Sequence, residues 1–226
     1  MLILNYQPGC DPAHLVQIAE SSLRGGVNWL MLRVRNLPAA FCLDLALELR
    51  RLTRQHNALF GVNPFPALAE WSGADALHLP EHAPYHPPPA GALPEFFSPS
   101  FSHSASSPNP EKKILLGRSV HSVEVARQAA AEGCHYLLVG TMYPTRSHPE
   151  KPPEGLAMLQ AIHHAVALPL IAIGGITPER VAECLQAGAC GVAVVSGIAE
   201  APDVEAAAHR YRQALDEPAK ASLACR

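Results

Sequence analysis

The chain has 226 residues, of which 48% are hydrophobic and 16% charged, and its formal net charge is −3, which suits a soluble globular protein of one or two domains. No run of lysine or arginine supports a nucleic-acid partner, and no apolar run approaches the length of a membrane span. The six cysteines are scattered without a Cys-x-x-Cys pair, which predicts reduced thiols in a cytoplasmic protein.

Strand-like and helix-like segments alternate along the chain. Eight short apolar segments are predicted as strands, at residues 2–6, 27–33, 58–63, 75–79, 113–117, 134–140, 169–175 and 190–197. Helices are expected between most of them, at 11–24, 38–55, 67–71, 123–132, 156–166 and 178–187, and after the last strand at 203–215.

This pattern predicts an α/β fold built as a (β/α)8 TIM barrel. Continuous apolar strands between helices are typical of a parallel sheet covered by helices. Eight such units fit a barrel, and the lack of an early Gly-x-Gly-x-x-Gly disfavours the alternative, a doubly wound open sheet.

The alternation stops after the fourth predicted strand. Residues 83–112 are rich in proline and serine, which block helices and favour local turns. We expect an irregular insertion here, either a disordered segment, which the composition favours, or a mobile lid. The single barrel domain is therefore expected to span residues 1–216, with residues 217–226 as a C-terminal tail.

Small residues end the last two predicted strands. Gly174 and Gly175 end the seventh, and Val195, Ser196 and Gly197 end the eighth. Glycine lets backbone N–H groups approach an anion closely, and the loops after strands seven and eight of such barrels often bind phosphate. The pattern predicts a phosphate site, and the alternative is a pair of ordinary strand-to-helix turns.

Polar residues also end the second and third predicted strands. Arg33 closes an apolar run, and Arg35 follows two residues later. An arginine is costly to bury without a partner, so this pair predicts an anionic ligand, unless the side chains lie on a surface loop. Asn63 ends the third strand, where its amide can donate and accept hydrogen bonds.

Hydroxyls and histidines follow the fifth and sixth predicted strands. Ser119 can hydrogen-bond a ligand, and His121 is a second candidate for proton transfer. His148 is the best-placed general acid/base, because the ordinary pKa of histidine lies near neutrality. His78, within the fourth strand, is interpreted as a structural histidine. Three further candidates for ligand binding are Thr141, Thr145 and Ser147.

Four segments resemble the thiamine phosphate synthase/TenI superfamily. They are GRSVHS at 117–122, GTMYPTRSHP at 140–149, IAIGGITPERV at 171–181 and GVAVVSGI at 191–198. The resemblance implies a (β/α)8 barrel that binds a phosphorylated thiazole through its glycine-rich loops. Members of the superfamily often pair, which implies a homodimer.

The resemblance to the synthases is uneven. Their pattern Q-L-R-E-K appears at 31–35 as MLRVR, which keeps Arg33 and replaces the lysine by Arg35. Their pattern P-T-x-T-K appears at 144–148 as PTRSH, so the lysine that binds pyrophosphate becomes His148.

Both carboxylates that bind Mg²⁺ in the synthases are absent from the matching positions. Their pattern N-D appears as Asn63-Pro64, and H-L-G-Q-x-D appears at 78–83 as HLPEHA. Because Mg²⁺ prefers carboxylate and phosphate oxygens, these changes disfavour a synthase.

HLPE and GRSVHS instead resemble the TenI side of the superfamily. The expected function is therefore a thiazole tautomerase, which makes the ring aromatic by proton transfer and needs no cofactor. Its catalytic residues would be His148, His121 and Arg33, because the TenI proton-transfer histidine corresponds to Thr141 here. The alternatives are a thiamine phosphate synthase, which would use Mg²⁺, and a non-catalytic phosphate-ligand-binding or regulatory protein.

Overall fold

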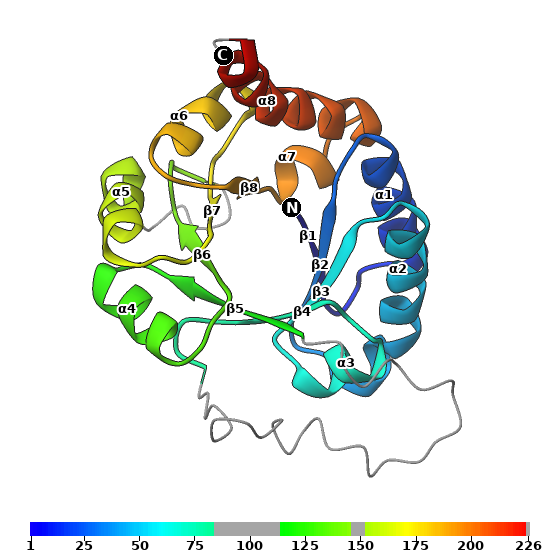
Figure 1. Cartoon of the computed structure of the whole chain (residues 1–226). Helices are drawn as coiled ribbons and strands as arrows, with labels where there is room; N and C mark the ends of the chain where they lie inside the picture. Colours follow the sequence, from blue (N-terminus) through cyan, green and yellow to red (C-terminus); the bar gives the residue numbers. More distant parts are fainter. Residues whose placement is uncertain (84–113, 146–151, 225–226) are drawn as a thin grey trace.

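A computed structural model describes residues 1–83, 114–145 and 152–224 (Figure 1). Its eight parallel strands form one sheet, in which each strand pairs with the next in sequence. The strands are β1 (Leu2–Tyr6), β2 (Trp29–Val34), β3 (Leu59–Asn63), β4 (Ala76–Leu79), β5 (Leu115–Val120), β6 (Tyr136–Gly140), β7 (Leu170–Ile173) and β8 (Gly191–Ala193).

The sheet closes on itself between its last strand and its first. Val194 pairs with Leu2 in a parallel bridge. The backbone N–H of Ile3 donates to the Val194 carbonyl at 2.9 Å, and the N–H of Val194 donates to the Met1 carbonyl at 3.0 Å. The prediction of a (β/α)8 barrel is confirmed.

Helices surround the ring of strands (Figure 1). None in the described part of the chain is both long enough and apolar enough to cross a membrane. The helices are α1 (Pro12–Arg24), η1 (Ala39–Cys42), α2 (Leu43–Gln55), α3 (Pro66–Trp71), α4 (Val123–Ala131), α5 (Gly155–Ala165), η3 (Pro178–Arg180), α6 (Val181–Gln186), α7 (Ser196–Ala199) and α8 (Val204–Ala224).

Several element boundaries differ from the sequence prediction, and three of these differences lie in the last part of the chain. The predicted eighth strand ends early, because Val195 leaves the extended region (φ −115°, ψ −94°) and the chain turns into α7. The helix predicted at 178–187 begins with the 3₁₀ turn η3. Helix α8 continues to Ala224, beyond the predicted end at 215. The division into a barrel and a tail at 217 stays a prediction, and the expected insertion lies, from residue 84 onward, outside the described residues.

Alternating strand residues form two apolar layers. The outer layer lies between strands and helices and makes up the larger cluster of buried side chains. The inner layer fills the barrel, as expected where successive residues of a strand point to opposite faces. Its buried members are Ile3, Met31, Ala76, Tyr136, Leu138, Ile171 and Ala193.

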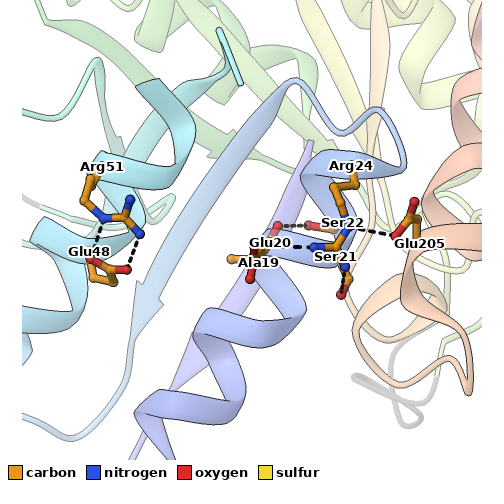
Figure 2. Close-up of polar contacts among 8 residues, drawn as sticks. All are labelled: Ala19, Glu20, Ser21, Ser22, Arg24, Glu48, Arg51 and Glu205. Carbon is orange, nitrogen blue, oxygen red and sulfur yellow. Dashed lines mark hydrogen bonds and ion pairs between the residues drawn. The ribbon is translucent and has the colours of Figure 1, made fainter. Parts of the chain in front are cut away.

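The first and last helices pack together outside the strand seam. Arg24 of α1 donates from Nε to Glu205 Oε2 of α8 at 2.9 Å (Figure 2). Next to it, a Cβ added to Gly25 would lie 2.4 Å from the Glu205 carbonyl oxygen. The exposed ion pair contributes little to stability, so the close backbone packing at Gly25 is the stronger constraint on this helix pair.

A buried ion pair connects α2 with β3 and with the residue that precedes β4. Arg50 donates to the two carboxylate oxygens of Asp75 at 2.6 and 2.9 Å. Asp75 Oδ2 also accepts the backbone N–H of Phe60 at 2.9 Å. Removing one partner would leave a buried charge uncompensated, so this pair fixes α2 against β3 and the start of β4.

We predict that Gly117→Ala destabilises the barrel, because a Cβ there would lie 2.0 Å from Cζ of the Tyr136 ring. Overpacking of this kind typically costs about 1–3 kcal/mol. Urea unfolding should show that loss for Gly117→Ala. Gly191→Ala is the matched control, since its Cβ meets no atom within 4 Å. Equal stability of the two variants would contradict this packing.

Candidate functional site

A cavity of about 630 Å³ opens at the carboxyl ends of the strands. This volume is in the range of small-molecule sites, which in barrels of this kind lie at the same end. Ser147 and His148 lie outside the described residues. All the other candidates from the sequence line the cavity: Arg33, Arg35, Asn63, Ser119, His121, Thr141, Thr145, Gly174, Gly175, Val195, Ser196 and Gly197.

Arginines give one side of the cavity its positive charge. Strand register places Arg33 between Asn5 and Asn63, at the ends of β2, β1 and β3. Arg33 is half-buried, and no described side chain forms a hydrogen bond or ion pair with it or with Arg35. Burial and the charge of Arg35 lower the pKa of Arg33 to about 10, so it stays charged at neutral pH. Two cations that have no counterion among the described residues therefore face the cavity.

No carboxylate is among the described residues that line the cavity. The two nearby glutamates are held by protein donors. Glu81 Oε1 accepts the backbone N–H of His121 at 3.2 Å. Glu154 accepts the backbone N–H of Thr141, and its Oε1 lies 3.4 Å from Nδ1 of His121. Within the described part of the chain, no carboxylate therefore balances the arginine charges.

The opposite side of the cavity is formed by the glycine loop after β7. Gly174 and Gly175 have φ values of 101° and 63°, in the left-handed region that favours glycine. A Cβ at Gly174 would lie 2.3 Å from Thr141 Cγ2, and one at Gly175 would lie 2.5 Å from the Pro144 carbonyl oxygen. Close packing against the loop after β6 is thus a second reason for glycine here, and phosphate binding by these amides stays a prediction.

His78 lies in a buried chain of hydrogen bonds. Its Nδ1 lies 3.2 Å from Tyr136 Oη, and its Nε2 lies 2.9 Å from Ser119 Oγ. The Tyr136 hydroxyl has no other acceptor among the described residues, so it donates to Nδ1 and the Nε2 hydrogen points to Ser119. Ser119, which lines the cavity, then keeps its own hydroxyl hydrogen for a ligand.

His121 is held beside the loop after β6. Its Nδ1 hydrogen-bonds the Gly140 carbonyl and lies next to the Glu154 carboxylate. Both partners are acceptors, so Nδ1 carries the hydrogen, and Nε2 has no partner among the described residues. This tautomer suits a base, but a catalytic role for His121 stays a prediction.

Arg180 of η3 is a cavity residue that the sequence did not single out. Its Nη1 donates to the Gly175 carbonyl at 2.8 Å, and its guanidinium lies 4.3 Å above the Tyr143 ring. The Tyr143 hydroxyl donates to Glu183 at 2.7 Å. The only signal in the sequence was a basic residue shortly after the glycine pair.

The chain is similar to proteins that make thiamine phosphate. Residues 1–88 and 104–198 match the family model TMP-TENI, described as thiamine monophosphate synthase. The thiamine-phosphate synthase of Methanoculleus marisnigri is 37% identical over 199 residues, which cover 88% of this chain and 86% of that protein. The thiamine-phosphate synthase of Moorella thermoacetica is 35% identical over 201 residues, with 88% of each chain covered.

Solved structures agree with the sequence comparison. The thiamine phosphate pyrophosphorylase from Pyrococcus furiosus superposes with a TM-score of 0.73 and 27% identity, covering 96% of this chain and 95% of that one. The expectation of a TenI-type thiazole tautomerase is wrong, since relatives at 31–37% identity are named thiamine-phosphate synthase. That expectation rested on the two missing Mg²⁺ carboxylates and on the short segments HLPE and GRSVHS, whereas the similarity to synthases extends over 88% of the chain.

We predict that the His78 ring stays neutral from pH 8 to about pH 4. Burial foremost, then Arg33 and Arg118, lower its pKa to about 3. Because this lies below the ordinary value of about 6.5, the unfolded chain binds the extra proton first, and stability falls as pH drops below about 6.5. Ring ¹⁵N chemical shifts, assigned with a His78→Gln sample, should not move in this range. A titration midpoint of the His78 ring near pH 6 would contradict the lowered pKa.

Proposed function

Because the chain belongs to the thiamine monophosphate synthase family, we propose that it is a transferase that forms thiamine phosphate. It joins an aminopyrimidine pyrophosphate to a thiazole phosphate and releases pyrophosphate. The observation that carries this proposal is the pair Arg33 and Arg35, which face the cavity without any described counterion. The glycine loops across the same cavity offer backbone N–H groups to a second anion.

In the proposed reaction, negative charge develops on the leaving pyrophosphate, beside the arginines. The bond between the pyrimidine methylene carbon and the pyrophosphate oxygen breaks, and pyrophosphate leaves with the bonding electrons. The lone pair of the thiazole nitrogen forms the new C–N bond, which leaves the positive charge on the thiazole ring. Cations placed where negative charge develops stabilise such a step, and guanidinium groups match phosphate oxygens in pairs.

The neutral residues of the cavity orient the two rings. Ser119, whose hydroxyl orientation is set by His78, offers a hydrogen bond to a polar ring atom of the pyrimidine. Asn63 is 8% exposed at the end of β3 and offers both a donor and an acceptor. On the other side, the amides near Gly174, Gly175 and Ser196 hold the thiazole phosphate. Such an arrangement would hold the two anionic groups apart, with the reacting atoms between them.

The resemblance to synthases implies Mg²⁺, but the described residues do not fit it. Mg²⁺ is bound by oxygen ligands, carboxylates above all. The matching positions hold Pro64 and Ala83, and the described lining contains no carboxylate. Within the described residues, no group of three or more histidine, cysteine, aspartate or glutamate side chains could hold a metal ion. The steps above therefore use the protein's own groups.

We predict that Arg33→Met lowers the rate of thiamine phosphate formation at least about 100-fold, the effect typical of losing one aimed electrostatic group. Chromatographic detection of the product from the two substrates measures this. Arg51→Met is the matched control, because Arg51 pairs with Glu48 on the exposed face of α2 (Figure 2). Equal rates in the two variants would remove Arg33 from the site. Absence of product with the unmodified chain would refute the synthase function itself.

A further inference from the structure

We infer that this chain stabilises the departing pyrophosphate with guanidinium groups in place of Mg²⁺, so that it works without a divalent cation. The inference rests on the proposed synthase function. It starts from the donor set of the cavity, which provides arginines and neutral groups but, among the described residues, no carboxylate.

The segment in which the synthases carry their second Mg²⁺ carboxylate binds a buried arginine in this chain. Arg118 donates from Nη1 to the Glu81 carbonyl at 3.2 Å and from Nη2 to the Ala83 carbonyl at 3.4 Å. Arg118 is 4% exposed and also pairs with Glu132 at 3.1 Å. The backbone oxygens at 81 and 83 therefore bind a buried guanidinium, and the side chain at 83 is a methyl group.

The carboxylates beside the cavity are also occupied. Glu81 binds the backbone N–H of His121 and lies 3.4 Å from Nε2 of His82. Glu154 binds the backbone N–H of Thr141 and lies beside the His121 ring. Using either as a metal ligand would break contacts that hold the loops after β5 and β6.

The net charge of the described lining disfavours a free divalent cation. Arg33, Arg35 and Arg180 are its cations, and no described acidic residue in the lining offsets them. A Mg²⁺ ion entering this cavity would be repelled, whereas pyrophosphate would be attracted. Arg33 lies on β2, and Arg35 follows directly after the end of this strand. At this spacing both guanidinium groups can bind one pyrophosphate.

The experiment measures product formation and pyrophosphate binding, each with excess chelator and with excess Mg²⁺. We expect the rate to agree within about threefold between the two conditions, since the groups that stabilise the leaving charge belong to the protein. Activity that is lost in chelator and restored by Mg²⁺ would overturn the inference while leaving the synthase function intact.

Calorimetric titration with inorganic pyrophosphate tests independence from Mg²⁺ separately from the synthase function, because binding needs no turnover. We expect binding in chelator, with an affinity that Mg²⁺ does not raise. Arg35→Met should weaken that affinity at least about tenfold, as loss of a charge-assisted contact does, and added Mg²⁺ should not rescue it. Arg51→Met, on the exposed face of α2, should bind as the unmodified chain does. Binding that appears only with Mg²⁺ would refute the inference even if no product forms.

Discussion

The positive charge of Arg33, which has no counterion among the residues that the structure describes, is the constraint on which the site depends. A half-buried guanidinium without a counterion is costly, and its lowered pKa reflects that cost. The barrel keeps it there because β2 pairs on both sides, with Asn5 and Asn63 as neighbours in register. In the proposed reaction, pyrophosphate would compensate this charge, so the cost of burying the guanidinium would favour binding of the anion.

The side chains packed inside the barrel support the residues that line the cavity. Gly117 leaves room for Tyr136, whose ring crosses the interior and packs edge-on against Trp29 at 4.9 Å between ring centroids. The Tyr136 hydroxyl reaches His78, and His78 reaches Ser119. A glycine in β5 thus sets the orientation of a hydroxyl at the cavity. The outer layer contributes by burying the apolar face of the helices, which keeps the strands in register.

The sequence predicted the fold well, because continuous apolar strands that alternate with helices are a local signal of a buried parallel sheet. All of its candidate site residues that the structure describes line the cavity, since the carboxyl ends of parallel strands meet at one edge, and their roles stay predictions. It missed Arg180 and the role of Glu154, because both depend on contacts between loops that are far apart in the sequence. It missed α7 because the backbone turn at Val195 follows an apolar run that resembles strand. The tautomerase prediction failed because it gave the missing Mg²⁺ carboxylates and two short segments more weight than the similarity that extends over 88% of the chain.

We propose that one cavity binds two anions, pyrophosphate at the arginines and the thiazole-side phosphate at the glycine loops. A crystal structure of the complex with thiamine phosphate and pyrophosphate tests it most directly. The account predicts pyrophosphate oxygens within hydrogen-bond distance of the guanidinium groups of Arg33 and Arg35, and the ester phosphate against the backbone N–H groups near Gly175 and Ser196. Pyrophosphate bound away from both arginines, or a phosphate that avoids the glycine loops, would contradict it.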